Sequence, residues 1–329
     1  TRVVCSTVGP YSKYGSKLVA ACVSNGTHYS DLTGEVHWMQ RMIDAYQDTA
    51  RESGARIVFT CGFDCIPSDV GAYFMYREMQ ARHGVPCASV QLRVAGFSGA
   101  ASGGTIASML TMMDEAEKDP SVMAAMNEPY SLNPKDERGG PDQAERSSPH
   151  YDEGFGQWVA PFVMAGINTK VVRRTNALLD HAYGRAFRYD EAMLMGGGPL
   201  GFAKAAATSA GSAAMTGAMS IGRLRRAASG RLPQPGEGPS PEKQEKGFFD
   251  IRLRGEHPTD PDATLWGRVR GDRDPGYGST SKMLAESALC LCEDELEVEG
   301  GFWTPAAAMG DRLLERLPAH AGVDFTIES

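Results

Sequence analysis

Residues 1–22 read TRVVCSTVGPYSKYGSKLVAAC and combine a strand-like run, a turn and a helical pattern. Residues 2–8 are rich in β-forming side chains and end at Gly9-Pro10. Residues 16–24 then carry apolar side chains at the spacing of a helix. The opening of the chain therefore predicts a strand, a tight turn at the end of the strand and a helix that packs back onto it.

The same order of elements occurs twice more along the chain. Residues 28–31 resemble a short strand and are followed by a helical pattern over residues 36–53. Residues 56–60 predict another strand, and residues 69–83 predict the helix after it. Strands that alternate with helices are joined by right-handed crossovers and form a parallel sheet covered on both faces. The first third of the chain thus predicts a partial doubly wound, Rossmann-like α/β sheet.

The pattern changes after residue 86. Residues 89–96, 247–256 and 264–271 alternate like strands, and a loop short enough for a hairpin separates the last two. Antiparallel strands with helices on one face are typical of an α+β domain. We therefore predict a boundary between a Rossmann-like domain over 1–86 and an α+β domain with a mixed or antiparallel sheet over 87–329.

The composition limits the class of partner. The 329 residues carry a formal net charge of -8, and no long stretch concentrates Lys and Arg. Binding to nucleic acid depends on clustered basic side chains, so we expect no nucleic-acid partner and a small-molecule ligand instead. The seven cysteines do not form a C-x-x-C pair, which favours reduced thiols in a cytoplasmic protein without a metal site.

Three loops follow the predicted parallel strands, at residues 7–11, 29–31 and 62–69. In doubly wound sheets, ligands bind outside the carboxyl ends of the strands, where such loops converge. Each loop alone has a plain structural explanation, because Gly-Pro ends strands and an Asp such as Asp69 caps helices. Three such loops at one edge favour a binding site.

Several blocks of the sequence are familiar from one family. The blocks are STVGPYSKYGSKLVAACVSNGTHYSDLTGE, FTCGFDCIPSD, GFSGAASGGTIAS, EKGFFDIRLRGE, GDRDPGYGSTSKMLAESAL and GGFWTPAAAMGDRLLERL. Together they cover nearly the whole chain, which resembles the saccharopine dehydrogenase-like oxidoreductases and, within them, the branch of trans-acting enoyl reductases. The resemblance implies that residues 1–86 are the later part of an NADP-binding domain and that residues 87–329 contact the substrate or a second subunit.

Members of that family begin with a strand, a G-A-x-G-x-x-G turn and a helix, and none of these precedes Thr1. The resemblance therefore implies that this chain lacks the N-terminal portion of its nucleotide-binding domain. Those glycines let the pyrophosphate of the cofactor approach the backbone at a helix N-terminus. We accordingly expect NADP as the cofactor of the family fold and weak binding of NADPH by these 329 residues.

The loops and the resemblance together give a set of candidate site residues. The expected cofactor-binding residues are Thr7, Val8, Gly9, Pro10, Tyr11 and Asp31. The expected substrate-binding residues are Phe63, Asp64, Ser102, Gly103, Gly104 and Thr105, the last four at the start of a predicted helix whose free amides suit an anionic group. Tyr29 and Asp64 are the candidate proton donors, while Tyr11 is better explained by packing, and Ser279 by helix capping.

One further motif matches a dinucleotide-binding pattern only in part. Residues 196–201 read GGGPLG, which satisfies G-x-G-x-x-G between a predicted strand at 187–195 and an Ala-rich helix. A dinucleotide-binding unit also needs a second parallel strand ending in Asp or Glu roughly 20 residues later. The chain instead continues with a basic cluster and a Pro/Gly-rich loop. We therefore expect no phosphate-binding turn here.

The segment from 193 to 226 allows two interpretations. It is rich in Gly, Ala and Met, carries Lys204 as its one charge before the cluster Arg223, Arg225 and Arg226, and suits either a membrane interface or a lipid-chain pocket. A helix packed inside the second domain is the alternative. Peripheral membrane contact of a cytoplasmic protein and formation of a homo-oligomer both stay open.

Two function classes follow from these observations. The first is an NADP-dependent oxidoreductase that reduces an enoyl or imine group in a lipid-linked or amino-acid-derived substrate. The second is a non-catalytic lipid-surface or scaffold protein that keeps the fold without the turnover.

Overall fold

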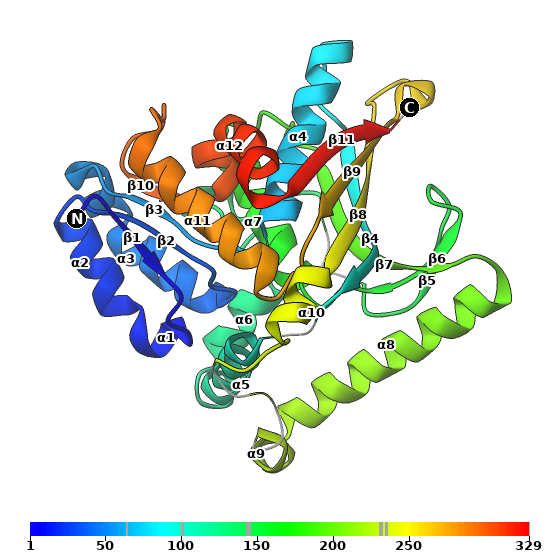
Figure 1. Ribbon diagram of the computed structural model, residues 1–329, viewed down its shortest axis with the longest axis horizontal. Coiled ribbons are helices and arrows are strands. Elements are labelled where there is room, and N and C mark those ends of the chain that lie inside the picture. Colours follow the sequence, from blue (N-terminus) through cyan, green and yellow to red (C-terminus); the bar gives the residue numbers. More distant parts are fainter. Residues whose placement is uncertain (64, 100–101, 143–145, 230–232, 234–235, 329) are drawn as a thin grey trace.

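The computed structural model describes residues 1–63, 65–99, 102–142, 146–229, 233 and 236–328. It contains a small parallel sheet near the N-terminus and a larger mixed sheet, with helices between and around them (Figure 1). This arrangement confirms the predicted combination of a parallel α/β sheet with a second, mixed sheet.

The parallel sheet, called sheet A, has the strand order β1-β2-β3-β10. Its strands are β1 (Val3–Ser6), β2 (His28–Asp31), β3 (Arg56–Val58) and β10 (Gly301–Trp303). Its first helices are α1 (Tyr11–Tyr14), α2 (Ser16–Ser24), α3 (Val36–Ser53) and α4 (Ile66–His83). The periodic pattern predicted α2 and α3 with these bounds, whereas the single turn α1 was not predicted.

Helix α4 begins three residues before the predicted start, because Pro67 fits its first turn. Asp69 therefore lies inside the helix and does not cap it. Its fully buried carboxylate accepts hydrogen bonds from the amide of Ala306, at 2.8 Å, and from the hydroxyl of Thr175. Burial raises the pKa of Asp69 to about 7. Asp69 thus links α4 to α7 and α12 and does not have the capping role that offered the plain explanation of this loop.

The mixed sheet, called sheet B, has the strand order β11-β9-β8-β4-β7-β6-β5. Its strands are β4 (Ser89–Ser98), β5 (His150–Asp152), β6 (Gln157–Pro161), β7 (Arg188–Gly196), β8 (Phe248–Glu256), β9 (Leu265–Gly271) and β11 (Val323–Glu328). Strands β4 and β7 are parallel and the other neighbours are antiparallel. The predicted hairpin of β8 and β9 is confirmed.

The remaining helices surround the two sheets. They are α5 (Gly103–Lys118), α6 (Pro120–Asn127), α7 (Ala165–Leu178), α8 (Gly198–Ser220), α9 (Gly222–Ser229), α10 (Pro241–Lys246), α11 (Gly278–Glu293) and α12 (Pro305–Arg316). Helix α11 packs against β1 and β2, and β10 pairs in parallel with β3. A C-terminal segment thus completes sheet A, which the sequence did not predict, and the division at residue 86 stays a prediction.

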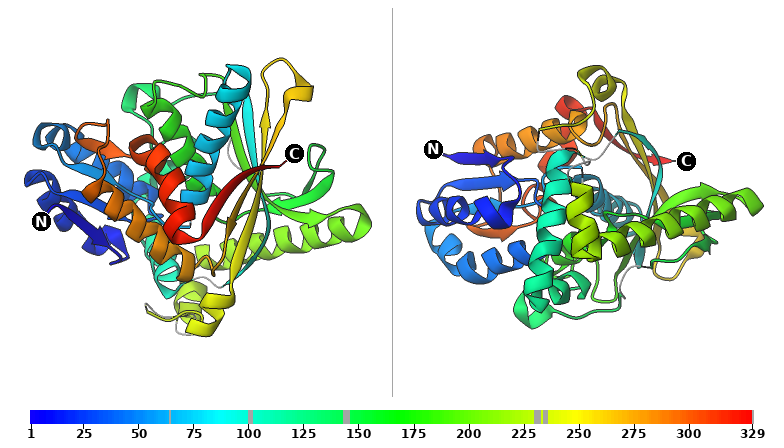
Figure 2. Two further views of the ribbon diagram at one scale, coloured as in Figure 1. Left: turned by 45° about the horizontal axis from the view of Figure 1, so that its top comes forward. Right: turned by 90° about the horizontal axis from the view of Figure 1, so that it is seen from below.

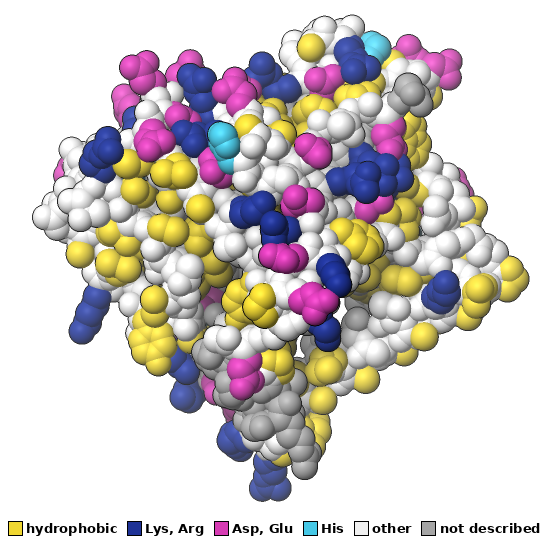
Figure 3. Space-filling model, viewed as in Figure 1, with side chains coloured by type: hydrophobic (Ala, Val, Ile, Leu, Met, Phe, Trp, Pro, Cys, Tyr) yellow, Lys and Arg dark blue, Asp and Glu magenta, His cyan; other side chains and the backbone are white. Residues whose placement is uncertain are grey.

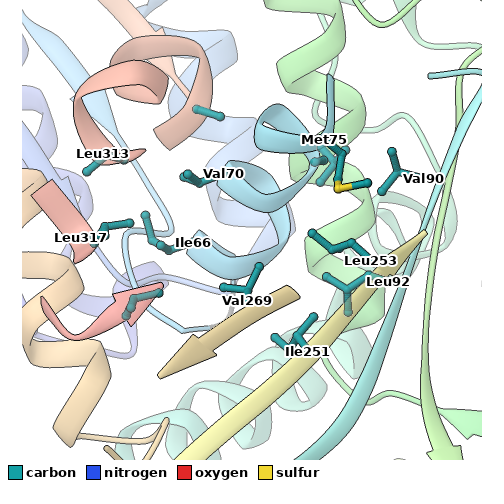
Figure 4. Packing of buried hydrophobic residues seen from close by; sticks show 14 of the residues in the cluster. Ile66, Val70, Met75, Val90, Leu92, Ile251, Leu253, Val269, Leu313 and Leu317 are labelled. Carbon is teal, nitrogen blue, oxygen red and sulfur yellow. The ribbon is translucent and has the colours of Figure 1, made fainter. Parts of the chain in front are cut away.

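The main core lies where α4 packs between α12 and sheet B (Figure 4). Met75 of α4 lies next to Leu253 of the sheet, whereas Val70 lies on the side of α4 toward Leu313 of α12, and all four side chains are fully buried. Gly267 on β9 allows this close approach, because a Cβ there would lie 2.4 Å from the sulfur of Met75. The core therefore holds α4 rigidly, and the loop before α4 stays at the edge of sheet A.

Helix α8 projects from the body of the molecule beside β6 and β7 (Figures 1 and 2). Most of its length is exposed, including the apolar side chains of Leu200, Phe202 and Met215. Strand β7 precedes α8, but the next strand, β8, pairs antiparallel with β4. The GGGPLG turn thus opens no βαβ unit, in agreement with the sequence analysis.

The basic cluster after α8 is only partly available to a membrane. Arg225 is buried and bonds to Asp114 and Glu117 of α5, at 2.6 and 2.7 Å, while Arg223 is exposed. Arg225 thus anchors α9 to α5, which the sequence did not indicate. Within the described part of the chain, no helix is both long and apolar enough to cross a membrane. Peripheral contact through residues 193–226 stays a prediction.

Candidate active site

A cavity of about 470 Å³ opens at the carboxyl edge of sheet A. The loops after β1 and β2 form one side of it, and the N-terminal parts of α5, α7 and α11 form the others. This position agrees with the rule that ligands bind where the loops after parallel strands converge. On the face shown in Figure 3, acidic and basic side chains are interspersed and do not form one basic surface.

The loop after β1 brings its main chain to the cavity. Thr7, Gly9 and Tyr11 line the cavity, whereas the Val8 side chain is 57% exposed and Pro10 is buried at the start of α1. The Tyr11 hydroxyl donates to the carbonyl of Ser6 at 3.0 Å. Burial, followed by the nearby Asp31 carboxylate, raises the pKa of Tyr11. Tyr11 thus fixes the loop, as the sequence indicated.

The Glu35 carboxylate joins this loop to α5. It is almost completely buried and accepts hydrogen bonds from the amides of Tyr11 and Ser12, both at 2.8 Å, and from the hydroxyl of Ser108 at 2.7 Å. Two elements that are distant in sequence therefore share one carboxylate at the edge of the cavity. Buried polar groups that are fully hydrogen-bonded in this way hold their surroundings in one arrangement.

A second carboxylate reinforces the same contact. Glu115 of α5 accepts from the Ser12 hydroxyl at 2.6 Å and lies 2.8 Å from the ring Nε2 of His37. His37 is buried on α3, so the first turn of α1 is held between α3 and α5. The polar side of the cavity is thus held by two separate carboxylates.

Tyr29 and Asp31 on β2 are fully buried and are not among the residues that line the cavity. The Tyr29 hydroxyl donates to Asp31 at 2.9 Å, and the amides of Thr33 and Thr60 donate to the other carboxylate oxygen. Burial raises the pKa of Asp31 to about 7 and raises the pKa of Tyr29. These two residues support the strand ends, and this position gives Tyr29 no direct contact with a ligand in the cavity.

The raised pKa of Asp31 predicts a pH-dependent stability. The folded protein binds this proton more tightly than the unfolded chain, so acid favours the folded state. The contribution of Asp31 is full below about pH 4 and is lost as the pH rises toward 7. We expect the wild type to lose stability relative to Asp31→Asn over this range, by up to about 1.4 kcal/mol per pH unit. Urea unfolding of both proteins at several pH values tests this, and parallel profiles would contradict it.

The start of α5 forms another part of the wall. Ser102, Gly104 and Thr105 line the cavity, and Ser102 also caps α5 by accepting from the amide of Thr105 at 3.1 Å. Gly103 is buried and its amide donates to the carbonyl of Glu237. Ser102 therefore combines the capping role and the ligand-facing position that the sequence treated as alternatives.

The two remaining predicted residues follow β3. Phe63 packs on Phe249 of sheet B, with 4.9 Å between ring centres, and its amide donates to the hydroxyl of Thr280 at 3.0 Å. It is not among the residues that line the cavity, although Thr280 is. Asp64, predicted both as a substrate ligand and as a proton donor, lies outside the described residues.

The N-terminus of α11 is organised by Asp274. This fully buried carboxylate accepts hydrogen bonds from the amides of Gly276, Tyr277 and Gly278, at 2.7 to 3.4 Å. The predicted cap, Ser279, instead donates from its hydroxyl to the carbonyl of Arg273. The capping role predicted for Ser279 is thus wrong, because the side chain that satisfies the helix amides comes from before the helix.

The sequence analysis missed Glu35 and the apolar side of the cavity. Glu35 stands four residues beyond β2, so the rule on strand-end loops could have identified it. The apolar side includes Met109, Met112, Met126 and Met164, which come from three helices. No local signal distinguishes these methionines from ordinary core residues. Among the described residues, no group of three or more His, Cys, Asp or Glu could hold a metal ion.

Comparison with known proteins identifies relatives over almost the full chain. A Mycobacterium tuberculosis (strain H37Rv) protein provisionally named as a trans-acting enoyl reductase is 44% identical over 98% of this chain and 79% of its own length. A trans-acting enoyl reductase of Mycobacterium ulcerans is 40% identical over 96% of this chain and 78% of its own length. A trans-acting enoyl reductase of Mycobacterium bovis is 40% identical over 98% of this chain and 79% of its own length.

Two other comparisons were less informative. The sequence matches no protein-family model. The solved amine dehydrogenase of Mycobacterium smegmatis is 12% identical, with a TM-score of 0.37 over 94% of this chain and 76% of that chain. The identity to the relatives above, sustained over nearly the whole chain, shows that the chain belongs to the trans-acting enoyl reductase family.

Proposed function

We propose that this protein is an NADP-dependent oxidoreductase that reduces the enoyl group of a lipid-linked acyl substrate. The observation that carries the proposal is the cavity at the carboxyl edge of sheet A, which has a polar, tightly hydrogen-bonded side and an apolar side. An enoyl thioester has the same division, with a polar thioester beside an apolar chain. The names of the relatives support the choice of an enoyl group over an imine.

The cavity suits the nicotinamide end of a dinucleotide better than its phosphates. Among the described residues that line it, Glu35 is the one charged side chain, and neither Lys nor Arg is present. Gly9 presents its main chain without a side chain, which permits a flat ring to approach. A diphosphate would need donors outside this cavity. We also propose a relation to saccharopine dehydrogenase-like enzymes, which rests on the sequence blocks quoted above.

The residues of this chain would position the substrate and exclude water. A reduced nicotinamide, when bound, supplies the hydride. The hydroxyls of Ser102 and Thr105 lie 3.0 Å apart on the cavity wall, so one of their protons is available for a thioester carbonyl. Glu35 and Ser108 fix the adjacent loop, and the apolar side holds the chain. Electron density drawn to the carbonyl makes the β-carbon of an enoyl group a better hydride acceptor, and a proton from solvent would then add to the α-carbon to give the saturated thioester.

The proposal is tested by following the oxidation of NADPH with an α,β-unsaturated octenoyl thioester at high cofactor concentration. We expect the saturated octanoyl thioester as product, identified by mass spectrometry, and slower turnover with NADH. A mixture of a ketone and an amine, which forms an imine, serves as the comparison substrate. If NADPH is consumed with the imine but not with the enoyl thioester, the protein reduces imines and the proposed enoyl reduction is wrong. Consumption with neither substrate would favour a non-catalytic protein.

A further inference from the structure

Among the residues that the structure describes, four methionines line the apolar side of the cavity. Met109 and Met112 come from α5, Met126 from α6, and Met164 from the start of α7. We call these four residues the methionine wall. All four are half-buried, so part of each side chain faces the cavity. Helices α5 and α6 pack together below sheet A in the view of Figure 1.

The two sides of the cavity differ in stiffness. On the polar side, Glu35 holds Tyr11 and Ser108 through hydrogen bonds of 2.7 to 2.8 Å. On the apolar side, each methionine is unbranched and has three rotatable bonds and a polarizable sulfur, so it adapts to irregular shapes at small cost. The geometry therefore fixes the reacting end of a ligand and leaves the other end adjustable.

We propose that the methionine wall is an acyl-chain subsite that accepts chains of different length and branching by rearranging its side chains. This inference takes the identity of the reacting group, an enoyl thioester, from the proposed function. The binding of the acyl chain does not depend on that reaction, because it needs only apolar contact with the methionines. The volume of about 470 Å³ is within the usual range for sites that enclose small ligands. Val163, just before α7, and Ile167, in the first turn of α7, extend the same apolar surface.

Neighbouring methionines supply matched controls. Met113 follows Met112 on α5 and is also half-buried, but it is not among the residues that line the cavity. Met123 precedes Met126 by one helical turn on α6 and is 38% exposed, again outside the lining. Changes at Met113 and Met123 alter the same two helices without altering the cavity.

The first experiment measures the binding of saturated thioesters by calorimetry, so no reaction is needed. The probes are butanoyl- and octanoyl-N-acetylcysteamine. We expect Met112→Ala and Met126→Ala to weaken octanoyl binding by about five- to tenfold, because each change removes apolar contact with the longer chain. Butanoyl binding should stay within about twofold of wild type, as should both probes with Met113→Ala and Met123→Ala.

The second experiment separates an adaptable wall from a fixed one. The double variant with Met112→Leu and Met126→Leu keeps nearly the same apolar volume but has stiffer side chains. We expect it to bind the linear octanoyl probe like the wild type. We expect it to bind an octanoyl probe with a methyl branch at carbon 6, in the part of the chain that would contact the methionine wall, about fivefold more weakly. Equal binding of the branched probe by both proteins would overturn the adaptable wall. If the alanine variants fail to fold, as judged by circular dichroism, this double variant still decides the question.

The outcomes distinguish this inference from the proposed function. If the wild type reduces no enoyl thioester but its octanoyl binding depends on Met112 and Met126, the acyl-chain subsite is supported and the proposed reaction is wrong. If the wild type reduces enoyl thioesters but the Met112→Ala and Met113→Ala variants bind the octanoyl probe equally well, the proposed reaction is supported and the acyl-chain subsite is wrong.

Discussion

Replacing Arg93 by Leu should lower the free energy of unfolding by about 3 to 5 kcal/mol. Arg93 lies on β4 with 2% of its side chain exposed, and it bonds to Asp152 at 2.6 Å and to Asp190 at 2.8 Å. Its guanidinium also lies over the ring of Phe155, 5.6 Å from the ring centre. Leu would leave the Asp152 carboxylate, which is 4% exposed, buried without its cation. Urea denaturation measures the change.

Two comparison variants make the interpretation specific. Arg77 forms an ion pair with Asp311 at the surface, where both side chains are about half exposed, so Arg77→Leu should cost less than about 1 kcal/mol. Adding Asp152→Asn to Arg93→Leu should recover part of the loss, since the uncompensated charge is then removed. If Arg93→Leu and Arg77→Leu lower the free energy of unfolding equally, the buried ion pairs of Arg93 stabilise the protein no more than a surface ion pair does.

Replacing Gly9 by Val should lower kcat/KM for enoyl reduction by about 100-fold, the size expected when reacting groups are displaced by roughly 1 Å. A Cβ at Gly9 would lie 3.3 Å from the hydroxyl oxygen of Ser108 and 3.5 Å from the Tyr11 ring. The two further methyl groups of Val would push α5 away from the loop or enter the cavity. Folding should survive, because Gly9 lies in a loop outside the main core. Steady-state kinetics, with calorimetry for NADPH, measure the effect.

A graded series checks that bulk at this position is the cause. Gly9→Ala should show a smaller loss, because its Cβ contacts are tight but can be relieved by a shift of a few tenths of an ångström. Gly211→Val on α8 should leave kcat/KM unchanged, since nothing lies within 4 Å of a Cβ there. A Gly9→Val protein with unchanged kcat/KM and NADPH affinity would reduce Gly9 to a turn residue.

Local sequence patterns by themselves determined the class of the fold and much of its first sheet. The bounds of α2 and α3 follow from helical periodicity, and the position of β2 follows from a short β-rich run between them. The rule on strand-end loops placed Thr7, Gly9 and Tyr11 at a cavity. These predictions held because helix and strand periods depend on hydrogen bonds between residues that are near one another in the chain.

Only the tertiary structure decided which distant segments meet. Strand β10 pairs with β3 from more than two hundred residues away, and the methionine wall comes from three helices. Asp31 was expected at the cofactor, but the sheet buries its side chain. Glu35, four residues further on, reaches the cavity and binds α5. The type and spacing of residues do not show which way a side chain points. That direction is set by how the helices pack onto the sheets, and this packing depends on the whole chain.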